Sequence, residues 1–253
     1  MVDTIIGAFP KEKREARKDG SKVLNVAEFF MNTVQGENIM GNPAMFLRLQ
    51  FCTLNCKWCD TAEVWRKGNP YSTIELLDLM EEKGAVEQLR KGQRLILTGG
   101  SPVKQQDALA DLLYRFFERF NFVPFVEVEN ECTLMPNIEF AQYISIWNNS
   151  PKLENSGNKK ELRYKPDVIR TIALQENAFF KFVITCEEDW EEIQRDFLDA
   201  GLIKREQIVV MPEGVDRKQL QSHYESCVNL ACREGVRFSD RLQVTIWDKT
   251  TGV

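Results

Sequence analysis

The sequence predicts an α/β fold, a single domain over residues 1–253 in which parallel strands close into a barrel or partial barrel. Two observations indicate this fold. Short runs rich in β-branched and aromatic residues alternate with amphipathic helical stretches. At least six of these runs have the composition of strands. In such a barrel the ligand site lies at the carboxyl ends of the strands, where we expect the functional residues.

The alternation continues along the chain. Strand-like runs cover residues 44–51, 94–100, 122–130, 143–147, 179–185, 207–214 and 241–247. Helical stretches lie between them at residues 72–92, 105–120, 166–177, 187–201 and 217–235. Several strands end in short polar or glycine-containing segments (TGG, EN, NNSPK and MPEG), as expected for a ligand-binding edge.

Two segments do not fit the alternation. The charged run at residues 11–22 predicts a solvated helix or arm. Residues 148–165 are polar and rich in Asn and Lys, which predicts a long surface loop or lid.

Composition restricts the class of function. The net charge of -5 argues against a protein that grips a nucleic-acid backbone and favours a small-molecule substrate. No apolar run approaches the roughly 20 residues of a membrane span, and no cleavage signature follows an apolar segment near the start, so we expect a cytoplasmic protein without membrane partners. The single histidine, His223, argues against Ser-His-Asp catalysis and His-rich zinc sites.

Three of the seven cysteines are clustered in CTLNCKWC, at Cys52, Cys56 and Cys59. They follow the strand at residues 44–51, so they fall in a loop that can direct all three sulfurs inward. An odd number of cysteines makes a disulfide framework unlikely and favours metal binding or catalysis. Structural zinc sites and four-iron clusters both normally use four ligands. Three thiolates would leave one iron open to another ligand, although zinc binding or chance stays open on spacing alone.

The Cys-x(3)-Cys-x(2)-Cys spacing, with an aromatic residue before the last cysteine, resembles the cluster motif of the radical S-adenosylmethionine enzymes. The stretch TGGSP, residues 98–102, resembles their Gly-Gly-Glu-Pro stretch. The resemblance implies a radical S-adenosylmethionine barrel whose 4Fe-4S cluster binds the amino and carboxylate groups of the cofactor through its open iron. An electron passing through the cluster then releases a deoxyadenosyl radical that abstracts hydrogen from the substrate.

A longer resemblance narrows the family. NTVQGENIMGNPAMFLRLQFC, residues 32–52, is similar to the stretch that precedes the cluster motif in the 7-carboxy-7-deazaguanine synthases. The match continues in family order through CDT, SPK, MPEG and a tail that ends in Trp-x(4)-Gly-Val. The resemblance implies a lyase that converts 6-carboxy-5,6,7,8-tetrahydropterin to 7-carboxy-7-deazaguanine with loss of ammonia, in queuosine-type biosynthesis.

The resemblance also implies roles for individual residues. The substrate contacts fall on Val34, Gln35, Gly36, Arg48, Thr98 and Val253, and the catalytic carboxylates on Glu37 and Glu129. The S-adenosylmethionine contacts fall on Gly99, Gly100, Ser101, Ser150, Pro151, Lys152, Met211, Pro212, Glu213 and Gly214. Cys52, Cys56 and Cys59 would hold the 4Fe-4S cluster, and Thr61 would help hold Mg²⁺. Without the resemblance, Gln35-Gly36 would be a turn, Arg48 a surface charge and Thr61 a helix start.

The family further implies an electron donor such as flavodoxin and a homodimer. Three departures from its pattern mark this chain as divergent: Ser101 replaces an acid, Glu131 and the following cysteine alter an Asn-Gly pair, and Gln243 or Val244 stands where relatives carry histidine. Two alternatives stay open, a radical enzyme that activates a partner protein and a non-catalytic metal or electron-transfer module.

Overall fold

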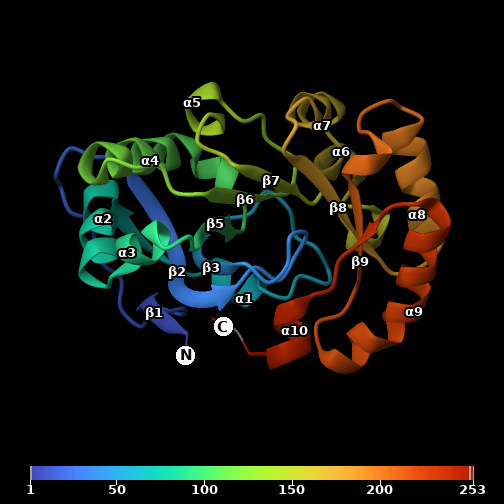
Figure 1. The fold of residues 1–253 in the computed structure, drawn as a ribbon, viewed down its shortest axis with the longest axis horizontal. Coiled ribbons are helices and arrows are strands. Elements are labelled where there is room, and N and C mark those ends of the chain that lie inside the picture. The colour runs from blue at the N-terminus through green and yellow to red at the C-terminus, as the bar shows by residue number, and fades with distance from the viewer. Residues whose placement is uncertain (1, 251, 253) are drawn as a thin grey trace.

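The computed structural model describes residues 2–250 and 252, and it confirms the α/β partial barrel (Figure 1). The parallel strands, in spatial order, are β3 (Pro43–Leu49), β5 (Arg94–Gly99), β6 (Val126–Asn130), β7 (Ile146–Asn149), β8 (Ala178–Ile184), β9 (Ile208–Pro212) and β10 (Arg237–Phe238). Antiparallel strands extend the sheet beyond β3: β2 (Val23–Val34) pairs with β3, with β1 (Asp3–Ile6) and with β4 (Asn69–Ser72). β1 and β10 end the sheet, so the barrel is open.

Helices surround the strands as an outer layer (Figure 1). They are α1 (Ala62–Trp65), α2 (Thr73–Glu82), α3 (Ala85–Arg90), α4 (Gln106–Phe120), α5 (Ile138–Ala141), α6 (Lys160–Arg163), α7 (Pro166–Ala173), α8 (Glu188–Ile193), α9 (Arg217–Glu234) and α10 (Leu242–Trp247). Short turns of other helix types complete the set: η1 (Pro102–Gln105), η2 (Glu154–Ser156), η3 (Gln194–Leu198) and η4 (Arg205–Gln207).

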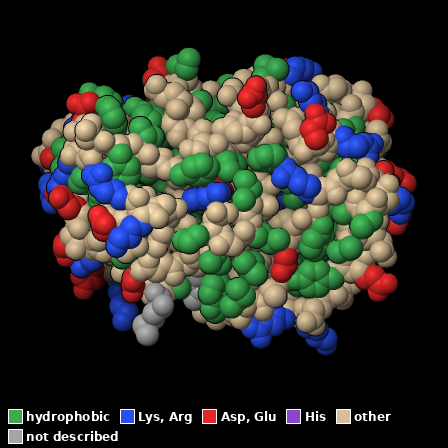
Figure 2. Space-filling view, viewed as in Figure 1, with side chains coloured by type: hydrophobic (Ala, Val, Ile, Leu, Met, Phe, Trp, Pro, Cys, Tyr) green, Lys and Arg blue, Asp and Glu red, His purple; other side chains and the backbone are tan. Residues whose placement is uncertain are grey.

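Hydrophobic burial between the strands and this layer forms the core. Leu97, Val128, Phe180 and Val210 on the parallel strands are each fully buried, as is Leu109 on the inner face of α4. Apolar residues on both faces of successive strands are what a parallel sheet covered by helices requires. Figure 2 shows that on one face of the molecule hydrophobic side chains gather centrally, with most charged ones at the periphery.

The secondary structure predicted from the sequence is wrong in two places. Residues 241–247 were expected as a strand, but they form α10, where Val244 is buried, because the parallel ladder has already ended at the two-residue strand β10. Residues 23–34 were not predicted as an element, yet they form β2, the longest strand of the described chain. Its registry with β3 shifts twice, which breaks the regular alternation that sequence analysis relies on.

The structure also shows the conformation of the two segments that did not fit the alternation, residues 11–22 and 148–165. Residues 11–22 contain no helix and lie as an arm whose Arg14 pairs with Glu75 of α2. Residues 148–165, expected as a loop or lid, begin inside β7 and contain η2 and α6, with Ser156 and Arg163 buried. Polar composition suggested a surface loop, but the polar groups are satisfied by contacts inside the protein. Within the described part of the chain, none of the helices is both long and apolar enough to cross a membrane.

Candidate active site

A cavity of about 550 Å³ lies where the parallel strands end, the position predicted for a ligand site. This volume is in the range of small-molecule pockets. The cavity is lined by the ends of β2, β3, β5 and β6, by the cysteine loop, and by residues of α10 and the chain's tail. Segments separated by more than two hundred residues in sequence therefore share one site.

Close backbone packing positions the cysteine loop. Gly100 follows β5, and a Cβ atom there would lie 2.2 Å from the Phe51 carbonyl oxygen and 2.6 Å from the Cys52 nitrogen. Gly99 has a φ of 124°, which favours glycine. The Ser101 N–H donates to the Phe51 carbonyl at 2.8 Å. The two glycines thus bring the start of the cysteine loop against the end of β5.

Each of the three clustered thiols accepts a hydrogen bond from an N–H group. The backbone N–H of Leu54 lies 3.4 Å from the Cys52 sulfur, and the indole N–H of Trp65 lies 3.5 Å from the Cys59 sulfur. The side-chain amide of Asn158 donates to Cys56 at 3.2 Å. N–H donors stabilise the negative charge of cluster-bound thiolates and help to set the reduction potential. The donor set around this loop therefore fits an iron–sulfur cluster held by three cysteines.

Burial raises the pKa of the Cys52 thiol to about 11 and also raises the pKa of Cys56. Metal binding requires the deprotonated thiolate, so cluster assembly here would release protons.

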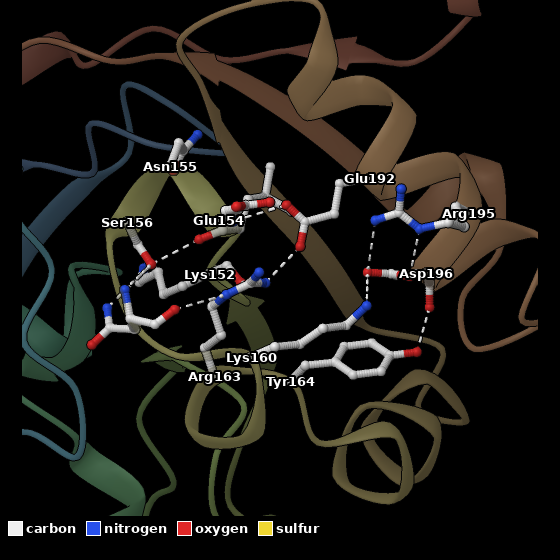
Figure 3. Close-up of polar contacts among 12 residues, drawn as sticks. Lys152, Glu154, Asn155, Ser156, Lys160, Arg163, Tyr164, Glu192, Arg195 and Asp196 are labelled. Atoms are coloured by element: carbon white, nitrogen blue, oxygen red, sulfur yellow. Dashed lines mark hydrogen bonds and ion pairs between the residues drawn. The ribbon is translucent and has the colours of Figure 1, made fainter.

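The segment after β7 supports the cysteine loop from the outside (Figure 3). Its Ser156 carbonyl accepts the N–H of Lys57 at 2.9 Å, and its Asn155 carbonyl accepts the indole N–H of Trp58 at 3.2 Å. A buried ion pair fixes this segment to α8, since Arg163 donates to Glu192 at 2.6 Å with both side chains less than a tenth exposed. Residues 148–165, which were expected to form a surface loop or lid, therefore support the cysteine loop and are themselves held in place by this ion pair.

Three further ion pairs lie at the cavity, and all of their residues except Glu28 belong to its lining. Arg48 of β3 pairs with Glu28 of β2 at 2.6 Å, Lys181 of β8 pairs with Glu37, and Arg241 pairs with Asp60. Glu28 and Arg48 lie opposite each other on the paired strands β2 and β3, and together the three pairs place both positive and negative groups around one pocket.

These ion pairs determine the charge states of Glu37 and Arg48. Burial disfavours the ionised form of Glu37, but the ammonium of Lys181 outweighs it and lowers the pKa of that carboxyl. Burial likewise disfavours the Arg48 cation, and the Glu28 carboxylate outweighs it and raises the pKa of Arg48.

Glu129, the second predicted catalytic carboxyl, behaves differently. Burial, followed by the negative charge of Glu37, raises the pKa of Glu129 to about 7. The hydroxyl of Thr98 donates a hydrogen bond to the same carboxyl. A carboxyl group with a pKa near 7 can hold or release a proton at neutral pH.

Gln35 is fully buried beside the cavity. Its amide nitrogen donates to Glu127 at 3.0 Å, and its amide oxygen accepts the backbone N–H of Glu37 at 3.3 Å. Glu127 also accepts from Asn148 at 2.7 Å. In this structure Gln35 therefore orders the turn that carries Glu37.

Most residues singled out in the sequence meet at the cavity. Its lining includes Val34, Gln35, Gly36, Glu37, Arg48, Cys52, Cys56, Cys59, Thr61, Thr98, Gly99, Gly100, Glu129, Ser150, Lys152 and Met211. Five expected cofactor contacts lie off the lining, namely Ser101, Pro151, Pro212, Glu213 and Gly214. Gly214 instead packs against α9, because a Cβ there would lie 2.6 Å from the backbone nitrogen of Leu220. The prediction for Val253 lies outside the described residues.

Sequence analysis missed several residues of the site. Glu28, which pairs with Arg48, and Lys181, which lines the cavity, each interrupt an apolar strand. A charged residue in such a strand is a signal that could have identified both. Arg241 and Asn158 carry no comparable signal, because only the folded chain brings Arg241 to Asp60 and Asn158 to the cysteine loop. Gln243 of α10 lines the cavity with its amide oxygen buried and without a hydrogen-bond partner among the described residues.

Comparisons with known proteins identify relatives of this chain. Residues 34–127 match a family model described as a 4Fe-4S single cluster domain. A 7-carboxy-7-deazaguanine synthase of Pyrobaculum aerophilum is 29% identical over 90% of this chain and 97% of its own, and one of Halobacterium salinarum is 27% identical over 93% and 95%. The crystal structure of QueE from Escherichia coli superposes with a TM-score of 0.65 at 21% identity, covering 88% of this chain and 96% of that one.

The open barrel and the three-cysteine loop at its strand ends define a radical S-adenosylmethionine enzyme that uses a 4Fe-4S cluster. The relatives extend over almost the entire chain and share one name. Over most of its length this chain is similar to the 7-carboxy-7-deazaguanine synthases.

Proposed function

We propose that this protein is a radical S-adenosylmethionine lyase that converts 6-carboxy-5,6,7,8-tetrahydropterin to 7-carboxy-7-deazaguanine with loss of ammonia. The observation that carries the proposal is the sharing of one cavity by the three-cysteine loop and the charged side chains of Glu37, Arg48 and Lys181, each of which is held in an ion pair. Cluster chemistry and recognition of a polar, carboxylated substrate are thereby brought together. Proteins named 7-carboxy-7-deazaguanine synthase match 90% and 93% of the chain.

The residues of the cavity suit a pterin with a carboxylate. Arg48 can receive the carboxylate while it stays paired with Glu28, since a guanidinium has five N–H donors. Thr98 and Gln243 offer a hydroxyl and an amide to the pterin edge, which presents both donors and acceptors. The unpartnered oxygen of Gln243 needs a donor, and the amino group of a pterin supplies one.

Glu129 is the residue to which we assign the proton that accompanies ammonia loss. Its pKa of about 7 lets the carboxyl give a proton to a leaving amine and recover one from water near neutral pH. Glu37 has the opposite charge state, because Lys181 keeps it ionised. Two carboxyls with separated pKa values are a common arrangement for acid and base roles in one site.

We assign the 4Fe-4S cluster to Cys52, Cys56 and Cys59, and S-adenosylmethionine to the adjoining part of the cavity at Gly99, Gly100, Ser150, Lys152 and Met211. When bound, these groups supply the deoxyadenosyl radical that removes a hydrogen atom from the substrate. The protein's own part is to hold the substrate at Arg48, to exclude water, and to place Glu129 near the reacting ring.

Magnesium and the partners also belong to this proposal. Thr61 lines the cavity two residues after Cys59, where its hydroxyl can join substrate and water around Mg²⁺. The single domain, a cytoplasmic location, a homodimer and an electron donor such as flavodoxin are proposed from the family resemblance.

An anaerobic assay tests the proposal. Reconstituted protein is mixed with reductant, S-adenosylmethionine, 6-carboxytetrahydropterin and Mg²⁺, and deoxyadenosine and the deazapurine are followed by mass spectrometry. Formation of both supports the proposal. Deoxyadenosine without deazapurine would retain the radical chemistry and reject this substrate.

A further inference from the structure

We propose that Glu131, which follows β6, supplies the carboxylate that binds the amino group of S-adenosylmethionine. The strand β6 pairs with β5, after which Ser101 lies. This inference rests on the use of S-adenosylmethionine assigned above. It concerns how this chain holds the amino-acid end of the cofactor when position 101 has no acid.

Glu131 is a buried carboxyl group at the wall of the cavity. It follows β6, its exposed fraction is 5%, and it belongs to the cavity lining. One carboxylate oxygen, Oε1, accepts hydrogen bonds from the hydroxyls of Ser101 at 2.6 Å, Thr133 at 2.7 Å and Thr53 at 2.8 Å. These three donors fix the orientation of the side chain.

The second carboxylate oxygen, Oε2, is buried and has no hydrogen-bond partner among the described residues. Glu131 also forms no ion pair within the described part of the chain, whereas Glu37 and Asp60 of the same cavity are each paired with a cation. A buried acceptor without a donor is unfavourable, and for a carboxylate the cost is larger. The oxygen is therefore arranged for a donor that arrives with a ligand.

The position of Glu131 indicates which ligand group supplies that donor. Thr53, which binds Glu131, directly follows the cluster ligand Cys52. The part of S-adenosylmethionine next to the cluster is its amino-acid end, which offers one donor, the amino group, and one anion, the carboxylate. The carboxylate would be repelled by Glu131, and Lys152 on the same cavity can receive it. The amino group then falls to Glu131.

The local sequence explains why the carboxylate at this point of the cavity belongs to residue 131 and not to residue 101. Ser101 is fully buried, and its small side chain leaves room for the Glu131 carboxylate. A second acid at this point would place two buried carboxylates together, which is costly. Cys132 adopts a φ of 63°, and its N–H is bonded to the Asn130 side chain at 3.1 Å. This tight turn after β6 directs Glu131 into the cavity.

Binding measurements without pterin test the proposal. Wild-type and Glu131→Gln proteins with a reconstituted cluster are compared by equilibrium dialysis against S-adenosylmethionine. They are also compared against S-adenosylhomocysteine and its analogue in which hydrogen replaces the amino group. We expect Glu131→Gln to weaken S-adenosylmethionine binding about tenfold or more and to abolish the wild-type preference for the amino-bearing homocysteine compound. Glu139→Gln, on the exposed surface of α5, is the matched control and should match wild type.

A swapped variant, Ser101→Glu with Glu131→Ser, should recover most of the affinity and the preference. If Glu131→Gln does not retain its iron, Glu131→Asp replaces it, because the shorter side chain withdraws the carboxylate from the amino group and should reduce the preference at least threefold. Unchanged affinity and preference in an iron-replete variant would overturn the proposal while the proposed function stands. Failure of wild type to bind S-adenosylmethionine would overturn both.

Discussion

The side-chain amide of Asn158 donates a hydrogen bond to the sulfur of Cys56 at 3.2 Å, across 102 positions of sequence. The oxygen of the same amide accepts the backbone N–H of Asn55 at 2.9 Å. Asn158 thus contacts both a cluster ligand and the backbone of the loop that carries it. Its place is fixed by the brace between Arg163 and α8, because the Arg163 side chain also bonds the Asn158 carbonyl at 3.2 Å.

Replacement of Asn158 is expected to change the cluster's reduction potential. A hydrogen bond to sulfur stabilises the reduced, more negative cluster, so Asn158→Ala should lower the midpoint potential. A hydrogen bond worth about 0.5–1.5 kcal/mol corresponds to roughly 20–60 mV for one electron. A redox titration monitored by electron paramagnetic resonance measures the shift. Asn229→Ala, on the exposed face of α9, should leave the potential unchanged, and an equal potential in the two variants would refute this tuning role.

Loss of the buried ion pair at Arg163 is expected to destabilise the fold. Arg163→Met leaves the Glu192 carboxylate buried without its cation, which typically costs about 3–5 kcal/mol. Urea unfolding measures this loss. Arg170→Met, which breaks a pair on the surface of α7, should cost less than about 1 kcal/mol. The double variant Arg163→Met/Glu192→Leu should be more stable than Arg163→Met alone, and a further loss in the double variant would contradict the argument.

Each cysteine of the loop is expected to be required for the cluster. Cys56→Ala removes one of three thiolate ligands, so iron and acid-labile sulfide after reconstitution should fall to near background and deoxyadenosine formation should cease. Cys232→Ala, at an exposed position of α9, should retain both. Full deoxyadenosine formation by a variant lacking Cys52, Cys56 and Cys59 would exclude radical S-adenosylmethionine chemistry.

Glu129 is expected to make stability depend on pH. Its pKa rises from 4.5 to about 7 on folding, so between these values the folded state binds a proton that the unfolded state does not. This group's contribution to stability is therefore complete below pH 4.5 and is lost as the pH rises through 7. Glu129→Gln keeps an acceptor for Thr98 without the titration.

The Glu129→Gln variant should therefore gain about 1–3 kcal/mol relative to wild type between pH 5 and pH 8, measured by urea unfolding of the metal-free protein. Glu118→Gln, at an exposed position of α4, should show no such trend. A constant difference between wild type and Glu129→Gln across this range would show that Glu129 does not titrate there.

Replacement of Thr61 is expected to weaken magnesium binding without changing the iron content. Thr61→Val keeps the shape of the side chain and removes the hydroxyl, so the Mg²⁺ concentration needed for half-maximal activity should rise several-fold while iron content stays unchanged. The described residues contain no group of three His, Cys, Asp or Glu side chains placed to hold one metal ion, so the proposal assigns the other ligands to substrate and water. If the magnesium dependence of Thr61→Val equals that of wild type, Thr61 does not bind the ion.

The sequence predicted the features that depend on neighbours along the chain. The alternation of strands and helices follows from local periodicity, and the position of the cavity follows from the chain direction of parallel strands. The three cysteines lie within eight residues, so one loop suffices to bring their sulfurs to the cavity. The glycines at positions 99 and 100 were identified through a motif, and the structure supplies the reason, a backbone approach that leaves no room for a Cβ atom.

Only the tertiary structure decided which side chains pair at and around the cavity. Glu28 with Arg48, Glu37 with Lys181, and Asn158 with Cys56 each join segments whose own sequences contain no information about the partner. Likewise, residues 242–247 form α10 although their composition predicts a strand. Local sequence sets backbone periodicity and loop chemistry, whereas the charge state and hydrogen bonding of a buried group depend on whatever the fold places a few ångströms away.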